Sequence, residues 1–208
     1  MMFSLAVFGA AAALTAAQIV GIGPQNAFVI RQGLARSHVP SIVALCIVCE
    51  FGLVSLGVLG VGQSLFALPG LVRLLTWGGA AFIFVLGLMS LRKALKPSAA
   101  GSLAGSVVRG RRAALRTVLV VTLLNPYAWL DTVLLIGSVS ALYGKDGRLS
   151  FMVGSLLVSS LWFCLLGLLS GRFSAWFVRP GSMRALDGVI GGVMLLTAVS
   201  LVARFGVA

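Results

Sequence analysis

Long apolar runs, separated by charges, prolines and glycines, divide this chain into six segments of membrane-spanning length. The apolar core of a bilayer is about 30 Å thick and needs roughly 20 apolar residues in a helix. The predicted helices run from about Phe3 to Ile30, Val39 to Gly62, Leu71 to Leu91, Ala114 to Leu142, Ser150 to Leu169 and Ala185 to Ala203. The pattern therefore predicts an all-α integral membrane protein with six transmembrane helices.

Composition agrees with that assignment. Of 208 residues, 60% are hydrophobic and 10% are charged, whereas soluble domains carry about 25% charged residues. The polar side chains are too few to cover a water-facing globule. The first apolar run has no basic stretch before it and continues into a glycine-proline break, so we interpret it as a retained helix instead of a signal peptide.

The basic residues indicate an orientation. A net charge of +12 would suggest a nucleic-acid partner on a soluble domain, but these residues lie between apolar runs, where they act as topology signals and contact anionic lipid. We therefore expect membrane lipid and no nucleic acid as partners. Three alternate loops hold twelve of the sixteen: Arg31, Arg36, Arg92, Lys93, Lys96, Arg109, Arg111, Arg112, Arg116, Arg172, Arg179 and Arg184. These loops are expected to face the cytoplasm and both termini to face outward.

The chain also shows a weak internal repeat. Thr15 and Pro24 match Thr117 and Pro126 at an offset of 102 residues, and a second set of matches has an offset of 110 residues. Three helices per unit make the two copies inverted, as in many transporters. The predicted division is a first three-helix repeat at 1–95, a basic cytoplasmic linker at 96–112 and a second repeat at 113–208.

Two of the runs contain a proline break, in the segments GIGPQNAF and LLNPYAWLD. Pro24, after Gly23, and Pro126 lack an N–H group, so each leaves a carbonyl four residues earlier without its helical partner. The half-helix beyond each proline begins with unpaired N–H groups and a positive dipole end, which suit the carboxylate of an amino acid. Neutral polar groups beside the breaks come from Gln25, Asn26 and Asn125. A proline kink that only shapes the bundle is the alternative.

Two acids lie at mid-helix. Glu50 is central in the second run, and Asp131 follows the second proline. An ionised carboxylate at the bilayer centre costs about 2.5–3.5 kcal/mol, so such residues normally face a cavity, a partner or a substrate. A buried ion pair of Glu50 with Arg31 is the alternative. Asp187 lies in the first turn of the last helix, where its neighbour Arg184 explains it.

These features together fit a zwitterion with an additional positive side chain. Carboxylates bind a guanidinium in bidentate fashion, and aromatic side chains stack on it. The candidate substrate-binding residues are Glu50, Asp131, Gln25, Asn26, Asn125, Tyr127 and Trp129. No metal-ligand cluster, cofactor motif or hydrolytic triad accompanies them. The sequence therefore predicts a secondary transporter for a basic amino acid and not an enzyme.

The same segments resemble the LysE family of bacterial amino-acid exporters, most closely its arginine exporter branch. The matching stretches are GIGPQNAFVIRQGL, TWGGAAFIFVLGLMSLRKAL, LLNPYAWLDTVLLIGSVS and, more weakly, LDGVIGGVMLLTAVSLV. The resemblance implies export of L-arginine or L-lysine across the bacterial inner membrane without ATP. Glu50 departs from the family's usual aspartate in the second helix, and Asp187 lies near a position that is often Asn in the arginine branch.

Two alternative functions remain open. A related exporter of neutral amino acids such as threonine or homoserine has less need of two buried acids. A membrane thiol–disulfide carrier is suggested by Cys46 and Cys49, although small apolar packing explains them better. Small-residue ladders favour close helix packing inside the bundle, with a homodimer interface as the alternative; they comprise Gly9, Ala13, Ala17 and Gly21, Gly167 and Gly171, and Gly188 and Gly192.

Overall fold

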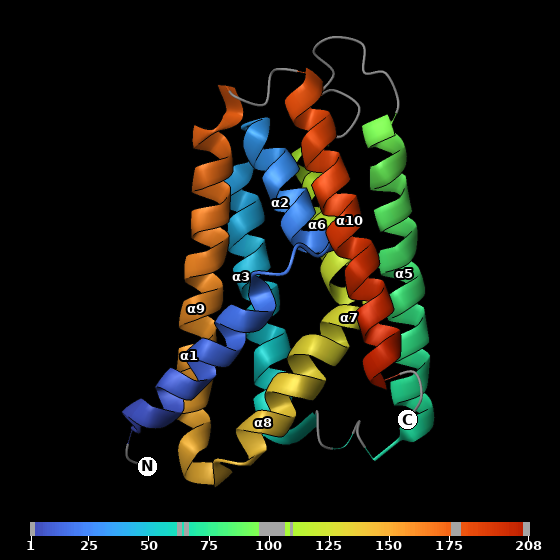
Figure 1. Ribbon diagram of the computed structural model, residues 1–208. Helices are drawn as coiled ribbons and strands as arrows, with labels where there is room; N and C mark the ends of the chain where they lie inside the picture. Colours follow the sequence, from blue (N-terminus) through green and yellow to red (C-terminus); the bar gives the residue numbers. More distant parts are fainter. Residues whose placement is uncertain are drawn as a thin grey trace.

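A computed structural model describes residues 3–61, 64, 67–95, 107–108, 110–175 and 180–205. Every regular element in these residues is a helix (Figure 1). Four helical stretches are long and apolar enough to span a membrane, and two bent helix pairs complete six spans, as the sequence predicted. The four are α3 (Val39–Leu56) continued by the π-helix η1 (Gly57–Val61), α5 (Pro69–Leu95), α9 (Gly144–Arg172) and α10 (Pro180–Phe205).

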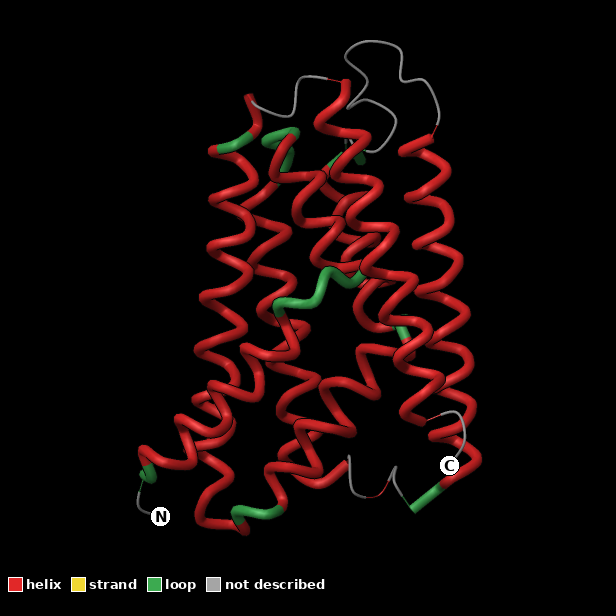
Figure 2. The backbone as a smooth tube through the Cα atoms, in the orientation of Figure 1, coloured by secondary structure: helices red, strands yellow, loops and turns green. Residues whose placement is uncertain are grey.

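The other two spans bend sharply at their prolines. Helices α1 (Leu5–Ile19) and α2 (Pro24–Leu34) meet at 73°. Helix α6 ends at Leu123, and the half-helix that follows turns by 55°. That half-helix comprises α7 (Pro126–Ala128), the π-helix η3 (Trp129–Ile136) and α8 (Gly137–Ala141), whereas α6 itself spans Arg111–Leu123. Each proline is the first residue of its half-helix, where the missing N–H is harmless. Figure 2 shows both breaks at mid-height.

The two broken spans run in opposite directions. In Figure 1, α1 starts at the lower end of the bundle and α6 starts at the upper end. Each broken span is followed by two straight ones, α3 and α5 or α9 and α10. The start of α1 and the end of α10 both lie at the lower end, which requires an even number of crossings. The predicted linker, 96–112, lies largely outside the described residues, and its last two residues begin α6.

Glycines allow the closest helix crossings. A Cβ atom added at Gly137 would lie 2.7 Å from the carbonyl oxygen of Gly57, so η1 and α8 touch backbone to backbone. Helices α5 and α10 pack along their lengths, and a Cβ at Gly191 would lie 2.9 Å from the Gly87 carbonyl oxygen. Close approach through small residues is the usual basis of helix association in lipid. These crossings hold the bundle around its middle.

The small-residue ladder of α1 does not pack inside the bundle. Gly9, Ala13, Ala17 and Gly21 are all exposed. Helix α1 packs on α9 through its other face, where the Phe8 carbonyl contacts Gly154. The expectation of internal packing was therefore wrong for this ladder.

Candidate functional site

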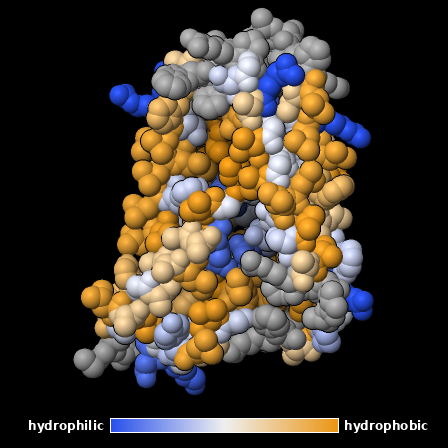
Figure 3. Space-filling model, viewed as in Figure 1, coloured by the Kyte–Doolittle hydropathy of each residue, from blue (hydrophilic) through white to orange (hydrophobic). Residues whose placement is uncertain are grey.

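A polar cavity of about 90 Å³ lies where the two helix breaks meet at mid-height. In the space-filling view, hydrophilic residues gather in a hollow in the middle of a hydrophobic surface (Figure 3). Its walls come from the end of α1, the start of α2, the middle of α3, and α7 with η3. Most residues predicted for the site line this cavity: Gly23, Pro24, Gln25, Asn26, Glu50, Asn125, Tyr127 and Asp131.

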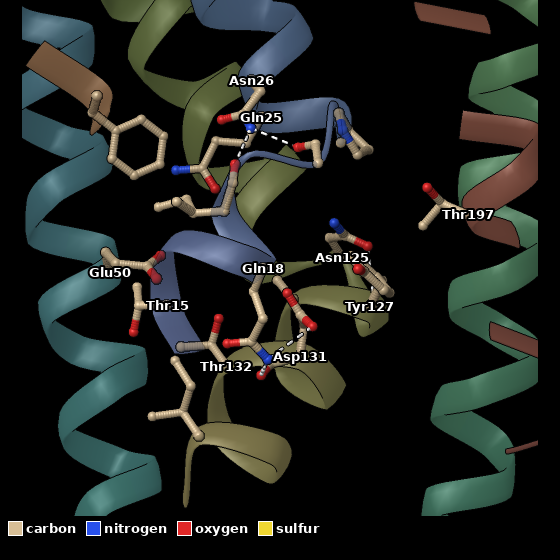
Figure 4. Close-up of a pocket in the computed structure, with 17 residues that line it drawn as sticks. Thr15, Gln18, Gln25, Asn26, Glu50, Asn125, Tyr127, Asp131, Thr132 and Thr197 are labelled. Atoms are coloured by element: carbon tan, nitrogen blue, oxygen red, sulfur yellow. Dashed lines mark hydrogen bonds between the residues drawn. The ribbon is translucent and has the colours of Figure 1, made fainter. Parts of the chain in front are cut away.

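The two mid-helix acids lie on different walls of the cavity. Glu50 on α3 is buried, with 7% of its surface exposed, and Asp131 on η3 is half-buried. Figure 4 shows Glu50 and Asp131 on opposite sides of the end of α1. Asp131 lies within a π-helical stretch, a form that is frequent at functional sites because it displaces side chains from regular helical positions. The cavity therefore receives negative charge from two helices at once.

Arg31 does not pair with Glu50. Its Nη2 atom lies 2.8 Å from Oδ1 of Asp187 and donates to Ser90 Oγ at 3.0 Å. The alternative ion pair between Glu50 and Arg31 is therefore wrong. The interpretation of Asp187 is corrected too, because Arg184 donates to the Ala94 carbonyl oxygen at 2.7 Å while the carboxylate of Asp187 meets Arg31.

Asn26 closes the end of the first half-helix. Its Nδ2 atom donates to the carbonyl oxygens of Ile19, at 2.8 Å, and Gly21, at 2.7 Å. These are carbonyls at the end of α1, where helical partners are missing. Trp162 Nε1 donates to Asn26 Oδ1 at 3.4 Å, so both ends of the amide are engaged. Asn26 lines the cavity, but its hydrogen bonds hold the break in shape.

The two half-helices begin differently. Asn125 Oδ1 accepts from the Tyr127 N–H at 3.1 Å and so caps α7. No side chain caps the first turn of α2, which follows Gly23. The first helical bond of α2 comes from the Ala27 N–H, so the N–H groups of Gln25 and Asn26, which line the cavity, precede it and have no helical acceptor. Of the two half-helix ends predicted to receive a carboxylate, the start of α2 is the better suited.

Sequence reasoning missed several residues that line the cavity. Gln18 Nε2 donates to the main-chain oxygen and to Oδ1 of Asp131, both at 3.3 Å, and so connects the two broken spans. The signal for Gln18 was present, since it is a polar side chain two residues before the break in an apolar run. The other missed lining residues include Thr15, Thr132 and Thr197.

Two predicted residues lie outside the cavity lining. Trp129 Nε1 donates to the Leu123 carbonyl oxygen at 2.8 Å, which satisfies one of the last carbonyls of α6. Pro126 starts the second half-helix without contributing to the wall. Tyr127 is the aromatic side chain of this segment that does line the cavity.

Several polar atoms at the cavity have no hydrogen-bond partner within the described residues: Thr15 Oγ1, Gln18 Oε1 and Gln25 Nε2. Leaving such an atom buried and unpaired costs about 1–3 kcal/mol. The volume is sufficient for several water molecules or a polar ligand group. The cavity thus offers donors, acceptors and two carboxylates to one polar, positively charged ligand.

Comparison with known proteins gives a consistent picture. The family profile described as LysE type translocator matches residues 16–204. An arginine exporter protein, ArgO, of Yersinia enterocolitica is 38% identical over 95% of this chain and 96% of its own length. ArgO of Salmonella newport is 37% identical over 94% of this chain and 92% of its own. A putative amino-acid transporter, YggA, of Aeromonas salmonicida is 37% identical over 89% of this chain and 90% of its own length. No solved structure shows a significant match.

Proposed function

Because this chain belongs to the LysE family of translocators, we propose that it exports a basic amino acid, arginine foremost, across the bacterial cytoplasmic membrane. Two of the relatives carry the name arginine exporter, and the third is named a putative amino-acid transporter. These similarities support a secondary transporter and not an enzyme. They cover nearly the whole chain, so the proposal concerns the entire bundle.

The observation that carries the choice of substrate is the pair of carboxylates at the cavity. Glu50 and Asp131 face it at mid-depth from α3 and η3. In the described residues, Arg31 is held by Asp187 and is not the counter-ion of Glu50. Acids kept at this depth normally serve a substrate, an ion pathway or a partner. A cationic side chain of the substrate would compensate their charge.

The remaining walls suit the rest of a basic amino acid. The uncapped first turn of α2 offers N–H groups and a positive dipole end to the α-carboxylate. Tyr127 lines the same cavity and offers an aromatic face to a guanidinium. Gln25 Nε2 provides a further unpaired donor. The substrate would lie across the two breaks, with its cationic end towards the acids.

The proposal also includes the internal repeats, the orientation in the membrane and the oligomeric state. The chain divides into inverted repeats at 1–95 and 113–208, joined by the cytoplasmic linker 96–112. The linker end of the bundle faces the cytoplasm, and both termini face outward. The exposed ladder of α1 supports a homodimer through that face, since small residues allow close helix approach in lipid.

The test is efflux from cells that lack their own exporter and are loaded with arginine-containing or lysine-containing dipeptides. Cells with the wild-type chain should release the basic amino acid, whereas Glu50→Gln and Asp131→Asn should reduce release at least tenfold. The physical reason is that each neutral side chain removes one charge facing the substrate cation. Membrane-inserted protein is quantified for each variant by immunoblotting.

Controls separate the rival functions. Cys46→Ser with Cys49→Ser should export normally, because a transporter does not use their thiols, whereas a thiol–disulfide carrier would lose its function. Parallel loading with threonine and homoserine peptides measures neutral amino acids. Wild-type rates in both acid variants, or faster export of the neutral amino acids, would contradict the proposal.

A further inference from the structure

Several of the serine and threonine hydroxyls described in these helices bond the same type of acceptor, a main-chain carbonyl oxygen. Serine and threonine side chains inside a membrane helix usually donate to the carbonyl oxygen one turn earlier. That bond is made by Thr76, Thr117, Thr197, Ser138 and Ser170. Thr15, Thr122, Ser155 and Ser159 differ, because none of these four buried hydroxyls has a hydrogen-bond partner of normal geometry within the described residues. These four hydroxyls make no bond to the helix that carries them and keep oxygen lone pairs for another ligand.

Two of the four, Thr15 and Ser159, lie near the same carboxylate. Thr15 on α1 is 2% exposed and lines the cavity together with Glu50. Ser159 on α9 is 1% exposed, and its hydroxyl interacts with the Glu50 carboxylate. Figure 4 shows Thr15 and Glu50 in the same part of the cavity, on the side of α3. Three different helices therefore direct oxygen ligands towards one buried place.

We propose that the Glu50 carboxylate and the hydroxyls of Thr15 and Ser159 form a binding site for a small monovalent cation, Na⁺. Hard cations prefer oxygen ligands, and transporters bind Na⁺ near the bilayer midplane beside broken helices. A negative carboxylate with neutral hydroxyl oxygens compensates a single positive charge. The unpaired lone pairs of the two hydroxyls are satisfied when the cation is bound.

In this assignment, which rests on the proposed function, Asp131 serves the substrate alone and Glu50 serves both the substrate and Na⁺. Asp131 is connected to α1 by the Gln18 amide and shares its end of the cavity with Tyr127. That wall is suited to a planar guanidinium. Glu50 lies among short hydroxyl side chains, which suit a point charge. Because Glu50 contributes to both positions, Na⁺ and the substrate cation compete for its charge.

Competition for one carboxylate provides a means of exchange. Substrate that arrives from the cytoplasm displaces Na⁺, and Na⁺ that arrives from outside displaces the substrate. The carrier then changes its orientation with one or the other bound. The inward Na⁺ gradient would thereby drive export against a substrate gradient.

The test measures Na⁺ binding to the purified full-length protein in detergent, through its melting temperature. Titration with NaCl at constant ionic strength should raise the melting temperature of the wild type, whereas KCl and choline chloride should not. Arginine should weaken the apparent Na⁺ affinity in proportion to its concentration, since both ligands need Glu50. Equal responses to NaCl and choline chloride, or a response to pH alone, would overturn the Na⁺ site.

Variants of the proposed ligands test where Na⁺ binds. Thr15→Val and Ser159→Ala should each weaken the apparent Na⁺ affinity about tenfold or more, as expected for losing one bond to a charged group. Thr117→Val is the matched control, because Thr117 is the predicted repeat counterpart of Thr15, is half-buried, and donates its hydroxyl to the Ala113 carbonyl. A tenfold loss in the control, or unchanged affinity in both test variants, would overturn the site.

Arginine binding in choline buffer separates this inference from the proposed function. If arginine stabilises the wild type and NaCl does not, the Na⁺ site is wrong while the substrate assignment stands. If NaCl stabilises it and neither arginine nor lysine does, the proposed substrate is wrong.

Discussion

Asn26 is a structural residue at the centre of the candidate site. Its amide donates to two carbonyls at the end of α1, and 6% of its surface is exposed. In a membrane interior, each freed carbonyl needs a partner from the protein or from a wet cavity. The geometry of the first break therefore depends on this side chain.

We expect Asn26→Leu to destabilise the protein by about 1–3 kcal/mol, because it leaves the Ile19 carbonyl oxygen unpaired at the break. The measurement is thermal unfolding of the purified protein in detergent. Gln25→Leu is the matched control, since Nε2 of this neighbouring amide bonds no carbonyl at the break within the described residues. Equal losses of stability in the two variants would show that Asn26 does not cap the break.

The sequence was sufficient to identify the two acids of the candidate site. It was insufficient to predict the roles of the amide side chains of Gln18 and Asn26. Glu50 and Asp131 were identified because charge at mid-membrane is costly wherever the helices lie. The bond of Gln18 to Asp131 joins residues 113 positions apart and depends on how two bent spans approach each other. Asn26 reaches back to Ile19 only because the chain turns between α1 and α2. Such roles depend on the bend angle, which no local pattern contains.

At the scale of elements, α2 is tied to two other helices near one end of the bundle. Arg31 in its last turn reaches Ser90 on α5 and Asp187 on α10. The side chains of the ion pair are 16% and 11% exposed. The first turn of the same short helix lines the cavity. The ion pair therefore fixes the element whose other end lines the cavity.

We expect Asp187→Asn to destabilise the protein by about 3–5 kcal/mol, because it leaves the Arg31 charge buried without its partner. The double variant with Arg31→Gln should recover much of this loss. Thermal unfolding of the two single variants and the double variant gives the coupling energy, expected at about 1–3 kcal/mol. The cycle of Asp187→Asn with Arg184→Gln should show no coupling, and strong coupling there would contradict the observed pairing.

The positions of the prolines correctly predicted where two spans break. The positions of the charged residues led to a wrong prediction of where the fifth span begins. The fifth span was expected at about Ser150, after the charged residues Lys145, Asp146 and Arg148. Helix α9 instead begins at Gly144. Charged side chains in a first turn are tolerated because they reach the membrane surface. Composition therefore marks the apolar core of a span better than the end of its helix.

At the scale of the whole molecule, the two ends of the bundle differ in charge. The lower end in Figure 1 has Arg73, Lys145 and Arg148 near the ends of α5 and α9. The upper end has more basic residues in the described chain: Arg31, Arg36, Arg92, Lys93, Arg111, Arg112, Arg116, Arg172 and Arg184. This asymmetry, known from the sequence, now coincides with the two ends of the fold. It supports a cytoplasmic position of the upper end.

Labelling with a membrane-impermeant thiol reagent checks the orientation in intact cells. In a background with Cys46, Cys49 and Cys164 replaced by Ser, Lys145→Cys should react from outside. Arg112→Cys at the start of α6 should react only after the cells are permeabilised, because the basic end stays in the cytoplasm. The reverse pattern would place the termini in the cytoplasm.

The proposed exchange of Na⁺ and substrate at Glu50 has a consequence for how the membrane voltage acts on transport. Moving one positive charge outward against an inside-negative potential of 100 mV costs about 2.3 kcal/mol. A singly charged substrate that leaves while one Na⁺ enters at Glu50 transfers no net charge. The voltage then contributes nothing to the driving force, and the Na⁺ concentration ratio alone limits accumulation outside. A cell whose membrane is depolarised would continue to export as long as its Na⁺ gradient persists.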